Sequence, residues 1–411
     1  MNRKQFVILL VLLAVLGGAG LLVQKHSNTA ATDTGVRDEG GKLLGDNFPI
    51  NDVAAISIQQ GTNALNLVKA DDLWRVRERN NYAADFSKIS GFLVKAADLK
   101  ILETEQLAPA DLPRLQLAAG QGTDAGVLLT LKDKDGKTLK ALTLGKSHFP
   151  KQAQKSQFGG EENYPDGRYV MLAGDSQDAL LLADPMSEIE PKPELWLNKD
   201  FFKVERPKTI AVDYPDATNS WRISRVNETG DWKLAGLKPG ETENTTNLPS
   251  VTSPFVAPSF DDVLTPANKP EETGLDKPTT ITVDTFDDFT YTVKVGKKSG
   301  DGYPITMMVV ANFPKERIPA PGEKPEDKSK ADKAWQDRQK QLDDNLKKAQ
   351  AYQNWVYVVP GWSLDSLLKN RADLVTEKVE EPKPAAKSDA TASKDSTNAP
   401  AAATDPPGDK Q

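Results

Sequence analysis

Residues 127–146 read "VLLTLKDKDGKTLKALTLGK", and residues 279–297 read "TTITVDTFDDFTYTVKVGK". In each stretch, apolar and polar residues alternate on both sides of an Asp-containing turn, as they do in a β-hairpin with one buried face. Both stretches end in Gly-Lys, so Gly145 corresponds to Gly296. A recurring hairpin predicts that the chain is built from two homologous modules.

Two other segments recur in the same order along the chain. Residues 53–78 ("VAAISIQQGTNALNLVKADDLWRVRE") resemble residues 208–236 ("KTIAVDYPDATNSWRISRVNETGDWKLAG"), which pairs Trp74 with Trp232. Residues 169–181 ("YVMLAGDSQDALL") resemble residues 356–368 ("VYVVPGWSLDSLL"), with Gly, Ser, Asp and Leu-Leu at matching positions. The spacing between the copies increases after Gly296, which predicts an insertion in the second copy.

Each module is expected to contain two helices. Residues 85–99 ("DFSKISGFLVKAADL") offer Asp85 as an N-cap, followed by apolar residues at helical spacing from Phe86 to Ala96. A second helix is expected after each Gly-x-Ser turn. Its cap would be Asp175 or Ser176 before Leu180 and Leu181, and Ser363 before Leu367 and Leu368. The predicted fold class is α+β, with antiparallel strands and helices in both modules.

Residues 6–23 form an uncharged apolar run, "FVILLVLLAVLGGAGLLV", which is long enough for a helix to span a bilayer. Arg3 and Lys4 precede it, so residues 1–5 are expected in the cytoplasm and the rest outside it. We interpret the run as an uncleaved signal anchor, with cleavage near "NTAA" as the alternative. The predicted location is the bacterial inner membrane, single-pass, with most of the chain in the periplasm. Self-association through Ala14 and Gly18 stays open.

Composition divides the rest of the chain. Residues 24–50 are polar and are expected to form a flexible tether. The first module is assigned to residues 51–200 and the second to residues 201–376. Residues 380–411 contain no aromatic or large aliphatic side chain, so the tail over residues 377–411 is expected to be disordered.

The insertion in the second module is expected to be a charged helix over about residues 325–353. It carries one narrow apolar stripe, made of Ala331, Trp335, Leu342, Leu346 and Ala349. Trp362 stands where the first copy has Asp175. The candidate contacts with a partner are Trp335, Leu342, Leu346 and Trp362, although the two tryptophans could instead cover each other.

Several of these features occur together in one known family. They are the N-terminal anchor, the strands leading to "WRV" at residues 74–76, the short helix, "LGK" at residues 144–146 and the "YVML" strand at residues 169–172. In this combination the chain resembles, over residues 50–375, the bacterial family called domain of unknown function 4340, in its two-copy form. The resemblance implies an exported, membrane-anchored accessory subunit, because such proteins are often encoded beside ABC-type and gliding-motility-type components. The family has no agreed catalytic residues to carry over.

The composition also narrows the possible chemistry. The chain has no cysteine, a formal charge of −7 and no basic block, which argues against disulfides, thiol chemistry and nucleic-acid binding. His26 falls in the tether, so a mechanism that needs histidine would have to use His148. No Gly-rich phosphate loop is present, and no catalytic, cofactor-binding or metal-binding residue is predicted.

Ser176 follows a predicted strand, as a hydrolase nucleophile would, but Asp178 stands where a G-x-S-x-G elbow needs its second glycine. Residues 132–137 ("KDKDGK") resemble part of a calcium loop, yet the required glutamate is missing, so we interpret them as a hairpin turn. Paired carboxylates of a glycoside hydrolase stay open, because their separation cannot be read from sequence.

Three hypotheses follow. The leading one is a non-enzymatic, membrane-anchored periplasmic protein that serves as an accessory or scaffold component of an ABC-type transport or motility-related envelope complex, with a permease or another envelope protein as partner. The second is a binding module for an envelope polymer or small ligand in a groove between the two modules. The third is a hydrolase that uses carboxylates or Ser176.

Overall fold

Strands dominate both halves of the chain, as their alternating sequences predict. The computed structural model describes residues 40–118, 125–150, 154–155, 161–162, 164–174, 178–255, 257–319 and 321–377. The predicted span, most of the tether, the tail beyond Glu377, Asp175 and Ser176 lie outside these residues. Within them, no helix combines the length and the apolar character needed to cross a membrane.

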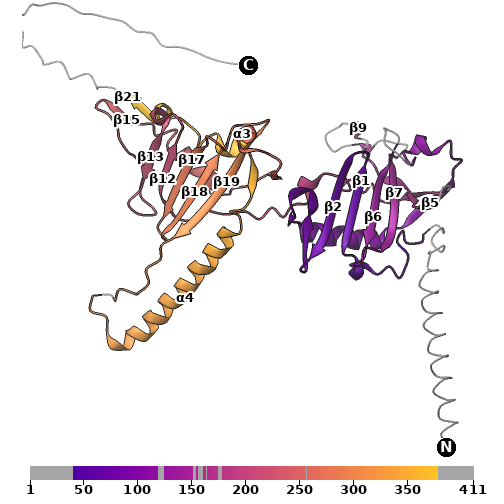
Figure 1. Ribbon diagram of the computed structural model, residues 1–411, viewed down its shortest axis with the longest axis horizontal. Helices are drawn as coiled ribbons and strands as arrows, with labels where there is room; N and C mark the ends of the chain where they lie inside the picture. The colour runs from indigo at the N-terminus through magenta and orange to yellow at the C-terminus, as the bar shows by residue number, and fades with distance from the viewer. Residues whose placement is uncertain are drawn as a thin grey trace, which may run out of the picture.

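The first module is a nine-stranded antiparallel sheet with the order β4-β3-β2-β1-β6-β7-β10-β11-β5 (Figure 1). Its strands are β1 (Ala55–Gln60), β2 (Asn63–Ala70), β3 (Leu73–Val76), β4 (Tyr82–Ala83), β5 (Ile101–Gln106), β6 (Val127–Lys132), β7 (Thr138–His148), β10 (Gly167–Leu172) and β11 (Asp178–Leu182). The short strands β8 (Gln154–Lys155) and β9 (Glu161–Glu162) pair only with each other.

The second module is an eight-stranded antiparallel sheet with the order β14-β13-β12-β17-β18-β19-β20-β16. Its strands are β12 (Pro207–Asp213), β13 (Trp221–Ser224), β14 (Lys233–Leu234), β16 (Asp262–Leu264), β17 (Thr279–Thr285), β18 (Phe289–Val295), β19 (Gly302–Ala311) and β20 (Val356–Pro360). A separate pair joins β15 (Glu241–Glu243) to β21 (Val375–Glu377). Apart from β4, the strands of the two sheets follow one another in the same order.

Helices are few among the described residues. The α-helices are α2 (Phe86–Asp98), α3 (Pro270–Thr273), α4 (Pro325–Gln350) and α5 (Gly361–Leu364). The 3-10 turns are η1 (Ile50–Asp52), η2 (Arg77–Arg79), η3 (Leu112–Leu115), η4 (Pro193–Trp196), η5 (Ala217–Asn219), η6 (Pro249–Phe255) and η7 (Arg371–Leu374). The predicted α+β class with antiparallel sheets is confirmed.

The α2 helix forms as its sequence predicts. The Asp85 side chain accepts a hydrogen bond from the Lys88 amide at 3.1 Å and so caps the first turn. The apolar positions of its inner face are buried against the sheet, and they are Ile89, Phe92, Leu93 and Ala96. Phe86 was also expected on this face, but it is 65% exposed, because the first residue of the helix extends beyond the edge of the core.

The strand pairing places the repeated residues in equivalent positions. In the first sheet Ile56 pairs with Leu67, and Leu67 with Val76. In the second sheet Ile210 pairs with Ile223, which pairs with Leu234. Trp74 lies two residues before Val76, and Trp232 lies two residues before Leu234, so the two tryptophans occupy equivalent positions. Trp74 is buried, whereas Trp232 is half-buried with the Arg225 guanidinium 4.8 Å from its ring centroid.

Gly145 and Gly296 are equivalent for a steric reason. A Cβ atom on Gly145 would collide with the carbonyl oxygen of Leu115, at the end of η3. A Cβ atom on Gly296 would collide with the carbonyl oxygen of Thr273, at the end of α3. In both modules a short helical turn therefore lies directly on the backbone of the sheet, which only glycine permits.

The prediction for the Gly-x-Ser segments is wrong in two respects. Leu180 and Leu181 lie on β11, paired with β10 on one side and β5 on the other, and not on a helix. A short apolar run after a turn is compatible with a helix or a strand. Here the segment forms a strand because β10 and β5 both offer it backbone hydrogen bonds. By strand order β20 is the counterpart of β11, so the alignment of residues 169–181 with 356–368 is displaced by one strand.

In the second module a short helix, α5, does follow β20, but Ser363 does not cap it. Ser363 lies inside the helix, and its hydroxyl donates a hydrogen bond to the Pro360 carbonyl at 2.7 Å. The corrected strand equivalence also places the insertion. It lies between β19 and β20, where the first module joins β10 to β11 through residues 173–177 only.

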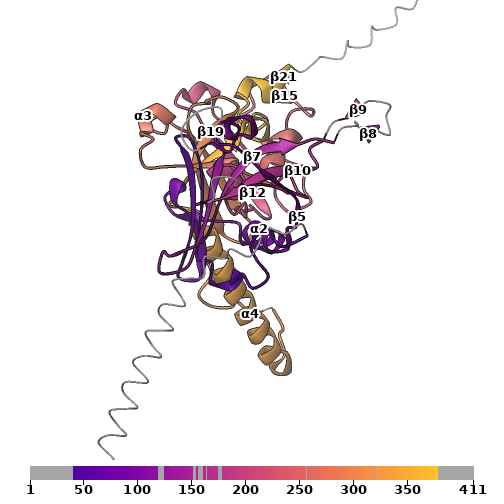
Figure 2. The same ribbon diagram turned by 90° about the vertical axis from the view of Figure 1, so that its right-hand side faces the viewer.

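The α4 helix lies within this insertion and projects beyond both sheets in the two views (Figures 1 and 2). Most buried apolar side chains of both modules form one continuous cluster, to which Leu342 and Ala349 of α4 also belong. A separate small cluster in the first module consists of Leu107, Leu115, Leu117 and Ala179. The two sheets therefore share a core at the place where they meet, and the second sheet also supports the base of α4.

Candidate functional site at the junction of the two modules

Six aromatic side chains form the junction of the modules, and we call them the aromatic joint: Tyr82, Phe201, Tyr352, Trp355, Phe260 and Tyr357. Tyr82 belongs to the first module and the others to the second. The Tyr82 ring centroid lies 4.9 Å from that of Trp355, 5.9 Å from that of Phe260 and 6.1 Å from that of Tyr357, all edge to face. These are favourable aromatic geometries, so Tyr82 joins the first sheet to the second.

A local turn positions Tyr82. Asn80 and Asn81 both adopt positive φ angles, of 54° and 59°, which asparagine tolerates better than most residues. The chain reverses there after η2. Tyr82 then lies in β4, at the edge of the first sheet, and pairs with Val76 of β3. Because β4 is the outermost strand of the first sheet, Tyr82 lies at the border of that sheet, within reach of the rings of the second module.

Phe201 closes the joint from the segment that links the modules. Its ring centroid lies 4.7 Å from that of Tyr357, 5.0 Å from that of Phe260 and 5.9 Å from that of Tyr352. Burial raises the pKa of Tyr82 to about 12 and also raises the pKa of Tyr357. Both phenols therefore stay protonated at neutral pH, and the joint is an uncharged packing surface.

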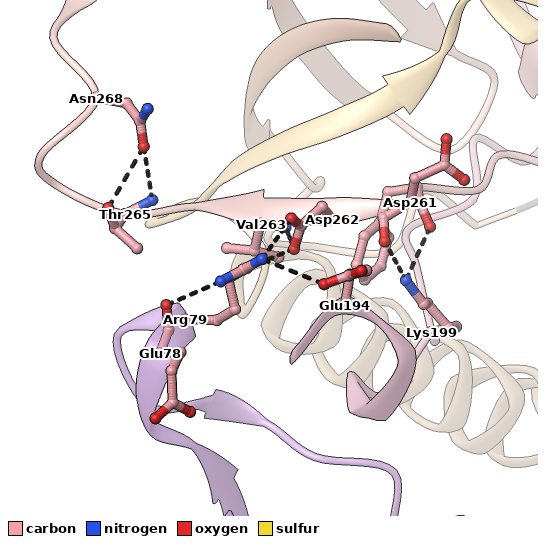
Figure 3. Close-up of polar contacts among 10 residues, drawn as sticks. Glu78, Arg79, Glu194, Lys199, Asp261, Asp262, Val263, Thr265 and Asn268 are labelled. Atoms are coloured by element: carbon pink, nitrogen blue, oxygen red, sulfur yellow. Dashed lines mark hydrogen bonds and ion pairs between the residues drawn. The ribbon is translucent and has the colours of Figure 1, made fainter. Parts of the chain in front are cut away.

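An ionic contact flanks the aromatic joint (Figure 3). The Arg79 guanidinium donates two hydrogen bonds to the Asp262 carboxylate, from Nε at 2.6 Å and from a terminal nitrogen at 2.8 Å. Glu194 lies 3.4 Å from the same guanidinium. Lys199 donates to the backbone carbonyls of Asp261 and Phe260. Bidentate pairing of this kind sets an orientation as well as adding energy, so the modules meet in one defined arrangement.

The base of α4 is attached to the same region. Leu342 and Ala349 are buried in the shared core, and Leu346 packs against it. Arg338 donates to the Asp287 carboxylate at 2.6 Å, and this carboxylate also pairs with Arg206. After the helix, Gln353 donates to the Val309 carbonyl at 3.1 Å. These contacts involve only the C-terminal half of α4.

The N-terminal half of α4 contacts the loop before it. Arg317 makes two hydrogen bonds of 2.6 Å to Glu323 and one of 2.7 Å to Asp332. Both partners in the Arg317–Glu323 pair are largely shielded from solvent, so this loop and the first turns of α4 form one unit. That unit lies beyond the edge of the sheet (Figure 1).

The structure does not bring the four predicted contact residues together. Leu342 is 7% exposed and Leu346 half-buried, both against the protein's own core. Trp335 is half-buried on the projecting half of α4. Trp362 is 77% exposed on α5, and within the described chain no ring contact joins it to Trp335. Two of the four thus serve internal packing, because the apolar stripe of α4 continues onto the sheet.

Two concave sites lie on either side of Tyr352. One, of about 250 Å³, opens between the modules and is lined by Arg75, Tyr82, Ala83, Asn198, Asp200, Ala351, Tyr352 and Trp355. We call it the inter-module groove. The other, of about 270 Å³, lies between α4 and the start of the second module. A concave, aromatic-lined groove between the modules is the feature that the second hypothesis required.

The described residues contain no assembled catalytic set. His148 Nδ1 lies 2.7 Å from the Asp166 carboxylate at the surface of the first module, and no described hydroxyl hydrogen-bonds to this ring. No group of three metal-ligating side chains is found in the described part of the chain. Ser176 lies outside it.

The family model for a domain of unknown function (DUF4340) matches residues 74–278. The chain belongs to this family. The matched region begins at Trp74 in β3 and extends beyond α3, so it includes Tyr82, Arg79, Phe260 and Asp262 of the junction. No curated protein and no solved structure matches the chain significantly.

Sequence reasoning missed the junction itself. Tyr82, Arg79 and Asp262 have no repeated counterpart that would single them out, and Arg79 and Asp262 are separated by 183 residues. The usable signal was aromatic density. "WLNKDFF" at residues 196–202 and "YQNWVY" at residues 352–357 hold more large rings than two short segments need for local packing.

Proposed function

We propose that this DUF4340 protein is a membrane-anchored, extracytoplasmic accessory component that holds a protein partner of an envelope complex and carries out no catalytic step itself. The observation behind the proposal is α4. Its C-terminal half is fixed in the shared core, while its N-terminal half projects into solvent with Trp335 on it. A long helix anchored at one end presents side chains away from the fold that supports it.

The rigid junction supports the same role. A scaffold must hold its contact surface at a set position relative to its anchor, and the bidentate Arg79–Asp262 contact together with the aromatic joint fixes the modules relative to each other. The family resemblance favours a permease or another envelope protein of an ABC-type or motility-related assembly as the partner. The apolar run over residues 6–23 supports attachment to the inner membrane.

Co-purification from solubilised membranes tests the proposal. The full-length chain should capture an envelope membrane protein, and Trp335→Ala combined with Trp362→Ala should reduce that capture. The matched control is Met308→Ala combined with Val310→Ala, which removes two exposed apolar side chains from the open face of the second sheet and should leave capture unchanged. Capture that is equal for all three proteins, or no capture by the unaltered chain, would contradict the proposal.

Membrane attachment is tested separately. The full-length chain should sediment with membranes and resist extraction by alkaline carbonate, and its modules should be digested by protease added from the periplasmic side. Deletion of residues 6–23 should leave the protein inside the cell in the soluble fraction. Protection of the modules from periplasmic protease would exclude the proposed orientation.

A further inference from the structure

The inter-module groove combines two aromatic side chains with three planar polar groups. Tyr352 and Trp355 are half-buried and line it from the segment after α4. Arg75 reaches it from β3 of the first module, and Asn198 and Asp200 from the segment that joins the modules. Three stretches of chain that are remote in sequence thus bring different functional groups to one concavity.

The fold leaves hydrogen-bonding capacity at the polar groups of the groove. Among the described residues, neither the Arg75 guanidinium nor the Asp200 carboxylate has a hydrogen-bond or ion-pair partner, and they do not pair with each other. Asn198 accepts a hydrogen bond from the Asp200 amide at 2.7 Å through its side-chain oxygen, which leaves its NH₂ group to donate elsewhere. The negative charge of Asp200 contributes to the raised pKa of Tyr352, after burial, as expected of a carboxylate near that ring.

The charges in the groove restrict the class of ligand. An anion would meet the Asp200 carboxylate, and a cation would meet the Arg75 guanidinium. A purely apolar ligand would take three polar groups out of water without giving them partners, which is costly. A neutral ring that carries hydroxyl groups avoids all three costs, since it can donate to the carboxylate, accept from the guanidinium and the amide, and place its C–H face on an aromatic ring.

We propose that the inter-module groove binds a neutral pyranose ring of a saccharide, with Asp200, Asn198 and Arg75 hydrogen-bonding its hydroxyl groups and Tyr352 and Trp355 packing against its face. The volume of about 250 Å³ is below the range of roughly 300–1,000 Å³ typical of larger ligand sites, so one ring enters and the remainder of a glycan stays outside. This assignment does not depend on the proposed protein partner.

Saturation-transfer NMR and titration calorimetry on the full-length chain test this assignment. The protein is reconstituted in nanodiscs of phosphatidylethanolamine and phosphatidylglycerol, without glycosidic detergent. The probes are cellotriose and N,N′,N″-triacetylchitotriose up to about 10 mM, a range suited to dissociation constants near 1 mM. Tetramethylammonium and inorganic phosphate serve as the cationic and anionic comparison probes. We expect saturation transfer to the ring C–H protons of at least one trisaccharide and none to tetramethylammonium, and we expect no binding heat with phosphate.

Variants locate the binding. Asp200→Asn and Arg75→Gln should each weaken trisaccharide binding by about tenfold, the loss expected for one hydrogen bond to a charged group. Asp213→Asn and Arg222→Gln are the matched controls, because these residues lie on the open side of β12 and β13 and should change binding by less than about twofold. All four variants should melt at the temperature of the unaltered protein.

Three results would overturn the assignment. They are no transfer to either trisaccharide, equal binding by the groove variants and the unaltered chain, and a preference for tetramethylammonium or phosphate over both sugars. Loss of binding in the groove variants with retained capture of the envelope protein would support the groove and the scaffold role as separate properties.

Discussion

The two modules share a strand order but differ in one connection. In the first module β10 joins β11 through residues 173–177, whereas in the second β19 joins β20 through a segment that contains α4. The sheet on either side is unchanged, because long surface insertions add little loop-closure entropy. The comparison indicates that the sheet supplies a common framework and that the second module gained its distinct surface at a loop.

The modules also cover their sheets differently. In the first, α2 buries one side of a regular helix against the strands. In the second, the corresponding stretch forms only the irregular turn η6, and Phe201, Phe202 and the base of α4 complete the cover. Large side chains from several segments can thus replace one amphipathic helix. The same segments build the junction, so the second module depends on distant parts of the chain more than the first does.

The largest expected effect is at Tyr82, the residue through which the first module enters the aromatic joint. Tyr82→Ala should lower the free energy of unfolding by about 3 to 5 kcal/mol, as for other buried aromatic truncations, and should separate one denaturation transition into two. Urea unfolding followed by circular dichroism measures both. Leu73→Ala, at a side chain that is 56% exposed on the neighbouring strand, should change stability by less than about 0.5 kcal/mol. A single transition of unchanged midpoint in Tyr82→Ala would show that the modules do not depend on this contact.

The next effect concerns the element that only the second module has. Leu342→Ala should cost about 2 to 4 kcal/mol, because it leaves a cavity between α4 and the shared core. Lys340→Ala, on the exposed side of the same helix, should be nearly neutral. Chemical denaturation of the purified variants gives both values. If the two substitutions cost the same, then α4 is not held by the core as the structure shows.

The correspondence between Gly145 and Gly296 can be tested directly. Each substitution by alanine should cost about 1 to 3 kcal/mol, since the new Cβ atom would push a helical turn away from the sheet. Gly91→Ala is the matched control: nothing lies within 4 Å of its added Cβ on α2, so it should stabilise the helix by about 0.5 to 1 kcal/mol. Thermal unfolding compares the three. Strongly unequal costs at Gly145 and Gly296 would argue against their structural equivalence.

A smaller effect is expected from the ionic contact between the modules. A double-mutant cycle with Arg79→Gln and Asp262→Asn should give a coupling energy of about 1 to 2 kcal/mol, because the pair is bidentate and mostly shielded from solvent. Added salt should reduce it only slightly. Additive effects of the two substitutions would show that the contact orients the modules without stabilising them.

The smallest effect depends on pH and belongs to the second module alone. Hydrogen bonds from Arg371, and then from the Lys238 amide, lower the pKa of Glu241 from 4.5 to about 2. Because the folded-state pKa is the lower one, the stabilisation is complete above pH 4.5 and is lost as the pH falls toward 2. The melting temperature of the unaltered protein should therefore exceed that of Glu241→Gln at pH 7, and the difference should shrink between pH 4.5 and 2. A difference that grows on acidification would contradict this assignment.

Local patterns in the chain predicted its local structures well. The alternating hairpins, the Asp85-capped helix and the charged helix near residue 325 all depend on residues close together in sequence, and each is present. The error at Leu180 and Leu181 has the opposite origin. These leucines satisfy a helix or a strand equally well, and β5, which lies more than 70 residues earlier, supplies the hydrogen bonds that make them a strand.

The site shows the same division. From the sequence alone came a repeated antiparallel sheet and an insertion in its second copy, and the lack of cysteine can be read directly from it. Periodicity and glycine positions are properties of neighbouring residues, and composition needs no structure. The sequence could not place Tyr82 beside Trp355, pair Arg79 with Asp262, or bring Arg75 and Asp200 to one groove. Those contacts join residues that lie far apart along the chain, and only the packing of one module against the other brings them within reach.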